Sequence, residues 1–213
     1  FLNRRYEDQH RMSIPSPEAI KALLANDALD TALPSDLIPS AVLLPLFQSD
    51  NEYHLILTKR SPQLKRDGGV ICFPGGMKEP NDVDLTFTAL REVYEEIGVE
   101  PSDVSVLGGF EPVMTRSQFA IQPIVGVIPH PYAYQPSEAE VEAIIEIPLN
   151  SLYDPTNLRV EGFLRPEGLI QKFSYVYQGQ IIFGATAQLL TRFLELISEG
   201  MEKEVPWQDR TLD

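Results

Sequence analysis

The sequence predicts a mixed α/β (α+β) fold, because short apolar runs with strand character are combined with two long helical patterns. Segments 41–47 and 53–59 are largely apolar, and the polar residues between them supply turn chemistry, which favours a β-hairpin. Segments 84–98 and 185–197 instead repeat their apolar side chains at helical spacing. A sheet with helices packed against it accommodates both patterns.

The elements follow one another in a readable order. Ser16, followed by a proline and a glutamate, is typical of a helix start and predicts a short helix through Leu29. After the hairpin come a charged, glycine-containing loop, a strand at 70–73 and a turn at 74–76. The long helix that follows ends at Gly98, a residue suited to a left-handed cap.

Further elements fill the second half of the chain. Three more β-like stretches are predicted at 104–110, 121–128 and 172–177. No internal repeat or low-complexity block divides the sequence. We therefore predict an N-terminal helical extension (1–40), one main domain (41–200) and a C-terminal tail (201–213).

The composition narrows the classes of partner. The 213 residues include 31 acidic and 17 basic side chains, a formal charge of −14 that repels nucleic acid. Cys72 is the only cysteine, so an intramolecular disulfide is impossible and a cytoplasmic location is expected. The apolar run at 37–47 is short and carries two prolines, so we expect no membrane span.

The helix at 84–98 gathers acidic residues. Its apolar stripe, which predicts docking on a sheet, is made of Ala89, Val93 and Ile97. Asp84 stands where a helix cap is expected. Glu92, Glu95 and Glu96 are spaced i, i+3 and i+4, so their carboxylates converge within one turn beside that stripe.

Two interpretations of this acidic face stand side by side. Clustered carboxylates hold hard divalent ions such as Mg²⁺ or Mn²⁺, which bridge phosphate oxygens and lower the pKa of an attacking water. Alternatively, the three glutamates form a solvated face that Arg91 neutralises through local ion pairs. The surrounding residues decide between the two.

Gly75 and Gly76, followed after a polar loop by REVYEEIGV at 91–99, resemble the Nudix box, a glycine-opened signature ending in REUxEExGU. The resemblance implies a Nudix-like α/β/α sandwich with a mixed sheet. It also implies that Glu92, Glu95 and Glu96 are metal ligands, that a backbone carbonyl of the glycine pair adds another, and that Arg91 holds the glutamates in place.

One position departs from that box. Eight residues before the arginine the family has a glutamate, whereas this chain has Val83, with Asp82 and Asp84 on either side. The loop is therefore one residue longer than usual.

The surrounding motifs are similar to the coenzyme A pyrophosphatase branch, whose signature runs LLTxRSxxxRxxxGxxxFPGG. This chain has LTKRS at 57–61, a glycine at 69 and FPGG at 73–76, and the likeness extends over residues 41 to 197. Lys65 takes the place of the second arginine, and Asp67 and Val70 depart from the histidine and the acid expected there.

Two further groups are candidate site residues. Arg60 and Lys65 belong to the densest basic cluster, which either meets substrate phosphates or forms a solvated loop. Glu140 is, by resemblance, a downstream glutamate that binds metal or activates water, and its alternative is an exposed helix start. The glycine pair completes the predicted substrate-binding set.

These patterns predict a metal-dependent pyrophosphohydrolase acting on a small-molecule nucleotide diphosphate. If coenzyme A or an acyl derivative is the substrate, the products are phosphopantetheine and adenosine 3′,5′-bisphosphate. The alternatives are ADP-ribose, NADH or a nucleoside triphosphate as substrate, and a non-catalytic nucleotide sensor. The apolar face of the final helix predicts either core packing or a homodimer contact.

Overall fold

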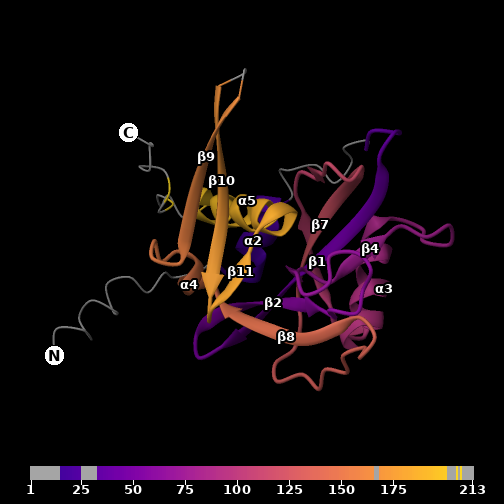
Figure 1. The fold of residues 1–213 in the computed structure, drawn as a ribbon. Helices are drawn as coiled ribbons and strands as arrows, with labels where there is room; N and C mark the ends of the chain where they lie inside the picture. Colours follow the sequence, from indigo (N-terminus) through magenta and orange to yellow (C-terminus); the bar gives the residue numbers. More distant parts are fainter. Residues whose placement is uncertain (1–14, 25–32, 166–167, 201–204, 206, 208–213) are drawn as a thin grey trace.

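A mixed eight-stranded sheet forms the centre of the fold, with a second, antiparallel sheet beside it (Figure 1). The computed structural model describes residues 15–24, 33–165, 168–200, 205 and 207. The larger sheet contains β1 (Ile38–Ser49), β2 (Glu52–Arg60), β3 (Ile71–Cys72), β4 (Gly75–Met77), β5 (Ser105–Gly109), β6 (Val113–Met114), β7 (Phe119–Val127) and β8 (Val141–Pro148). The smaller sheet contains β9 (Leu158–Arg165), β10 (Gly168–Tyr177) and β11 (Gln180–Ile182). The helical elements are α2 (Pro17–Leu24), α3 (Leu85–Ile97), the 3₁₀ turn η1 (Pro101–Asp103), α4 (Leu149–Leu152) and α5 (Gly184–Gly200).

The predicted hairpin is confirmed and is longer than expected. β1 and β2 pair antiparallel up to Ser49 and Glu52, so the connecting loop has two residues. Asp50 and Asn51 both have positive φ, 51° and 59°. That conformation matches the twist of the two strands, which explains why a short polar pair closes the hairpin.

β1 is the organising strand. It pairs in parallel with β7 over residues 38–46 and antiparallel with β4 over residues 40–42, where Val42 lies opposite Gly75. The prediction of a turn at 74–76 is therefore wrong for the glycines, which form the start of a strand. Gly75 is required there because a Cβ would lie 2.6 Å from the Cα of Val42.

The sheet is covered on both faces, which confirms the α/β/α sandwich. Alternating residues of β1 point to opposite sides, so Leu43 packs with α3 whereas Leu44 packs toward α2, α5 and the smaller sheet. The apolar residues of α5 are buried in that second core: Leu189, Leu190, Phe193, Leu194 and Ile197. Their core interpretation is confirmed.

Most of the remaining elements agree with expectation. α2 begins after Ser16, whose Oγ accepts a hydrogen bond from the N–H of Ala19 at 3.3 Å, and continues to Leu24. Its predicted continuation to Leu29 lies outside the described residues. The strands predicted near β3, β5, β7 and β10 are present, whereas β8 and β9 were not foreseen.

Helix α2 packs against β5 and α5. The division of the chain into segments 1–40, 41–200 and 201–213 stays a prediction. Across the described part of the chain, no helix is long and apolar enough to cross a membrane.

Candidate active site

Helix α3 fixes the register of the three glutamates. Asp84 caps its start, since the side-chain oxygen accepts a hydrogen bond from the N–H of Phe87 at 2.7 Å. Gly98 ends it in the left-handed conformation, with φ 71°, and donates its N–H to the carbonyl of Tyr94 at 2.9 Å. Both caps were predicted, and both are confirmed.

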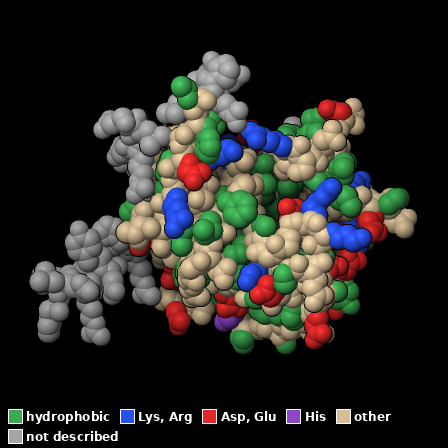
Figure 2. Space-filling model, in the orientation of Figure 1, with side chains coloured by type: hydrophobic (Ala, Val, Ile, Leu, Met, Phe, Trp, Pro, Cys, Tyr) green, Lys and Arg blue, Asp and Glu red, His purple; other side chains and the backbone are tan. Residues whose placement is uncertain are grey.

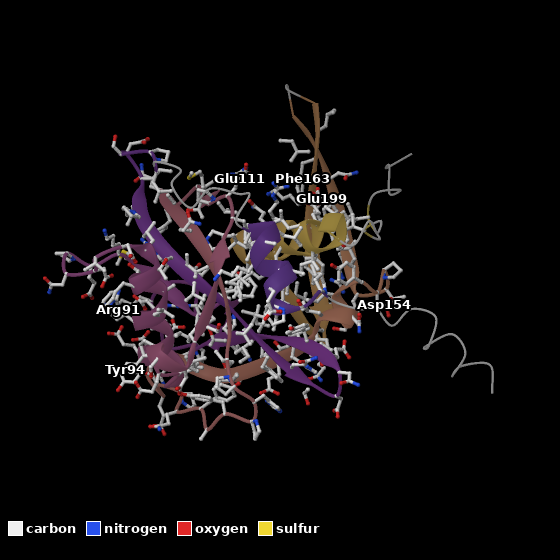
Figure 3. The ribbon with its side chains drawn as sticks, turned by 180° about the vertical axis from the view of Figure 1, so that it is seen from behind. Arg91, Tyr94, Glu111, Asp154, Phe163 and Glu199 are labelled. Carbon is white, nitrogen blue, oxygen red and sulfur yellow. The ribbon has the colours of Figure 1, made fainter. Side chains whose placement is uncertain are left out.

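Arg91, labelled on α3 in Figure 3, lies at the centre of a polar network. Its Nε and Nη2 donate to the two carboxylate oxygens of Asp82, each at 3.1 Å. Nη2 also donates to the carbonyl of Met77 at 3.1 Å. Nη1 donates to Glu92 at 3.0 Å and to Glu95 at 2.8 Å. The guanidinium therefore ties α3 to the loop before it and orients two of the glutamates.

Asp82 is a site residue that the sequence reasoning did not single out. It is 5% exposed, and it also accepts hydrogen bonds from the Thr88 hydroxyl and the Glu79 N–H, both at 2.9 Å. Its hydrogen bonds with Arg91 lower the pKa of Asp82 from 3.8 to about 2.

The departure from the family's usual loop is thereby explained. Val83, which occupies the position of the expected glutamate, is 78% exposed. Asp82, one residue earlier, reaches Arg91 instead across the longer loop. The pair of acids flanking Val83 was the available signal, but sequence alone did not show which acid caps the helix and which binds the arginine.

The glycine pair comes close to the glutamates. The carboxylate of Glu92 lies against Gly76, where an added Cβ would be 2.5 Å from Glu92 Cδ. Burial raises the pKa of Glu92, with Arg91 opposing the shift and Glu95 and Glu140 adding to it. The absence of a side chain at Gly76 is therefore what lets this carboxylate approach β4.

Glu96 is the most buried of the three glutamates, with 3% exposure. Burial raises its pKa from 4.5 to about 8, and the Arg60 guanidinium opposes that shift. Arg60 Nη1 lies 3.8 Å from Glu96 Oε1, whereas the buried Oε2 has no hydrogen-bond partner in the described part of the chain. Glu95 differs, because its side chain is 52% exposed and paired with Arg91.

Glu140 lies at the entrance to β8. Its carbonyl accepts a hydrogen bond from the Ser61 N–H at 2.8 Å, and its negative charge raises the pKa of both Glu92 and Glu96. The alternative interpretation as a helix start is wrong, because residues from Val141 form a strand that pairs with β2. Long-range pairing thus places this glutamate beside α3.

The basic cluster separates into different environments. Lys59 pairs with Glu142 at 2.9 Å, and Arg66 lies with its Cζ 5.9 Å from the ring centre of Phe119. Lys65 is exposed. Figure 2 shows a hollow between the two sheets with hydrophobic side chains inside it and basic side chains near its rim. Of the cluster, Arg60 is the member that the structure brings to the glutamates.

The glutamates of α3 are the candidate donors for a divalent metal. Among the described residues, no three histidine, cysteine, aspartate or glutamate side chains are already grouped around one metal position. Glu96 Oε2, however, is a buried carboxylate oxygen without a partner, and Glu92 adds a second oxygen donor close to the backbone of β4. Oxygen donors of this kind suit Mg²⁺ or Mn²⁺.

Comparison with known proteins settles the family. The family model described as NUDIX domain matches residues 37–162. The chain belongs to the Nudix hydrolase family. Members of this family act on phosphorus anhydrides.

Three similar proteins illustrate the range of this Nudix chain's relatives. Mouse (Mus musculus) peroxisomal coenzyme A diphosphatase is 38% identical over 115 residues, covering 54% of this chain and 49% of the mouse protein. Nudix hydrolase NudL of Yersinia enterocolitica is 36% identical over 162 residues, covering 75% and 81% of the two chains. A crystal structure of a Nudix hydrolase from Alicyclobacillus acidocaldarius shares the fold, with TM-score 0.52, 16% identity and coverage of 81% and 99%. The matched region thus spans about half the length of the mouse protein and most of the bacterial ones.

Proposed function

We propose that this Nudix hydrolase cleaves the diphosphate linkage of coenzyme A or its acyl derivatives, giving phosphopantetheine and adenosine 3′,5′-bisphosphate. The observation that carries the proposal is the carboxylate of Glu96 beside Glu92: among the described residues its buried Oε2 has no hydrogen-bond partner, and its Oε1 faces Arg60. The mouse relative, named as a coenzyme A diphosphatase, supports this choice of substrate, as do the motifs at 57–61 and 73–76.

The residues on α3 and the glycine pair bind the metal and leave room for the substrate. Glu92, Glu95 and Glu96 hold Mg²⁺ or Mn²⁺, which supplies positive charge to the diphosphate and lowers the pKa of the attacking water. Arg91, itself held by Asp82, positions two of these carboxylates. The glycine pair leaves room for a carboxylate and for substrate at β4.

Substrate contact and proton transfer fall to three side chains. Arg60 and Lys65 bind phosphate oxygens, with arginine offering the better geometry. Glu140, whose charge is felt by Glu92 and Glu96, accepts the proton of the attacking water. Water is the nucleophile.

A second candidate keeps the chemistry and changes the substrate to ADP-ribose, NADH or a nucleoside triphosphate. The departures at Lys65, Asp67 and Val70 favour it, since they fall within the coenzyme A signature. A non-catalytic nucleotide sensor is the third candidate, and the intact set of glutamates on α3 argues against it.

The first test is a product assay with Mg²⁺ and Mn²⁺ on coenzyme A, acyl-coenzyme A, ADP-ribose, NADH and nucleoside triphosphates, beside Glu96→Gln. Cleavage of coenzyme A that disappears in the variant supports the proposal. Preference for another diphosphate keeps the reaction and replaces the substrate. Tight nucleotide binding without any product favours the sensor.

Lys65→Glu sharpens the choice of substrate, because this exposed side chain can be reversed in charge without touching the glutamates. If Lys65 meets the 3′-phosphate of coenzyme A, turnover of coenzyme A falls more than turnover of ADP-ribose. Equal losses on both substrates reject that role.

A cytoplasmic location completes the proposal, and a homodimer stays a prediction. The lone cysteine supports the first. Sedimentation or light scattering of the purified chain tests the second.

A further inference from the structure

Arg60 is held loosely by the one carboxylate that it faces. Its side chain is 26% exposed, and Nη1 lies 3.8 Å from Glu96 Oε1, beyond the 2.7–2.9 Å typical of a charge-assisted hydrogen bond. Its Nε is buried and has no hydrogen-bond partner among the residues that the structure describes, and neither has Glu96 Oε2. Each member of the pair therefore keeps an unused polar atom in a place that water reaches poorly.

The backbone around Arg60 is fixed. Its N–H donates to the carbonyl of Val70 at 2.9 Å, and its own carbonyl accepts from the N–H of Gly69 at 3.0 Å. Across the sheet it pairs with Val141 of β8. A change of partner at Arg60 thus requires side-chain rotation alone, with the strand left in place.

We propose that Arg60 exchanges partners when the site is loaded: it faces Glu96 in the metal-free protein and turns to a phosphate oxygen of the diphosphate once a divalent cation takes Glu96. This inference rests on the proposed metal-dependent diphosphatase function. It gives Arg60 a role beyond substrate contact, because the same guanidinium links the metal site to the phosphate site.

The exchange of partners by Arg60 makes the binding of the metal and the binding of the diphosphate cooperative. A metal ion that binds alone leaves Arg60 as an uncompensated cation beside a second positive charge, which is unfavourable in a partly buried site. A diphosphate supplies the missing anion and uses the free Nε donor. Each ligand therefore strengthens the binding of the other, by the same factor in both directions.

The test measures Mn²⁺ binding by calorimetry on the full chain, with and without methylenediphosphonate, a diphosphate that resists hydrolysis. The variants are Arg60→Met, Arg60→Lys and, as a matched control, Lys59→Met. Lys59 is the neighbouring cation on β2 but pairs with Glu142. Titrations of Mn²⁺ into methylenediphosphonate without protein correct for their association in solution.

Methylenediphosphonate strengthens Mn²⁺ binding in the wild type, and Arg60→Met reduces that enhancement on the order of tenfold. Lys59→Met keeps the wild-type enhancement. Arg60→Lys, which retains the charge without the Nε donor, gives an intermediate value. It also preserves the measurement if the methionine variant folds poorly.

The outcomes separate this inference from the function on which it rests. A wild-type protein that binds no Mn²⁺ overturns the metal-dependent function itself. A wild type that binds Mn²⁺, with the same enhancement in Arg60→Met, overturns the exchange alone. Equal losses in Arg60→Met and Lys59→Met also overturn it, because the effect then reflects the general charge of β2.

Discussion

Two arginines flank the glutamates of α3, and their surroundings differ sharply. Arg91 uses Nε, Nη1 and Nη2 in hydrogen bonds of 2.8–3.1 Å to side chains and backbone of its own chain. Arg60 faces Glu96 at 3.8 Å, and its buried Nε has no hydrogen-bond partner within the described ranges. A guanidinium whose N–H groups are hydrogen-bonded stabilises the fold. One with unbonded N–H groups in a buried place lowers stability, and it is retained where a ligand accepts those hydrogen bonds.

The largest expected loss of activity is at Glu96, the glutamate that faces Arg60. Glu96→Gln removes a proposed metal ligand, so we expect activity to fall by at least about 100-fold, the upper range for residues that tune metal sites. Steady-state assays with Mg²⁺ and Mn²⁺ measure the loss. Activity within a few-fold of the wild type would remove Glu96 from the metal set.

The same variant is not expected to lose stability. Burial raises the pKa of Glu96 from 4.5 to about 8, so the metal-free protein loses stability as the pH rises through that interval, because the unfolded chain releases the proton before the folded protein does. Glutamine carries no such charge. Urea unfolding in EDTA at pH 7 should give a free energy of unfolding equal to or above that of the wild type.

The second-largest effect is expected in the network around Arg91, where a substitution should lower stability as well as activity. Asp82→Asn breaks the paired hydrogen bonds that hold Arg91, so we expect a loss of about 1–2 kcal/mol in the free energy of unfolding. Activity should fall about 10-fold or more, because Arg91 no longer holds the glutamates in position. A variant as stable and active as the wild type would show that the network at Arg91 is dispensable.

Lowering the pH should reduce the difference in stability between the wild type and Asp82→Asn. Because the folded-state pKa of Asp82 is lowered from 3.8 to about 2, its contribution to stability is present above pH 3.8 and is lost as the pH falls toward 2. The stability gap between wild type and Asp82→Asn should therefore shrink between pH 4 and pH 2. Urea midpoints across that range test it, and a gap independent of pH would contradict this origin.

The smallest effect is expected at Asp84, which lies two residues from Asp82 and caps the helix instead. Asp84→Ala should lower the free energy of unfolding by about 1 kcal/mol through loss of the cap. Activity at saturating substrate and metal should stay within about twofold, since in contrast to Asp82 this carboxylate makes no contact with Arg91. Thermal unfolding and a matched assay distinguish the two neighbouring acids.

The sequence by itself determined what depends on local spacing. The helix from Asp84 to Gly98, the convergence of its three glutamates and the hairpin turn at Asp50 follow from interactions a few residues apart, which the chain carries in its own order. The family signature belongs to the same level, because it is a local string of residues.

Tertiary structure alone decided the contacts that join distant segments. β4 formed where a turn was expected, because Gly75 pairs with Val42 more than thirty positions earlier. β8 brought Glu140 toward α3 through pairing with β2, and the end of β2 placed Arg60 at Glu96. The choice of Asp82 over Asp84 as the partner of Arg91 depended on the path of a loop. Such contacts are set by burial and strand pairing across the sheet, which residue spacing does not encode.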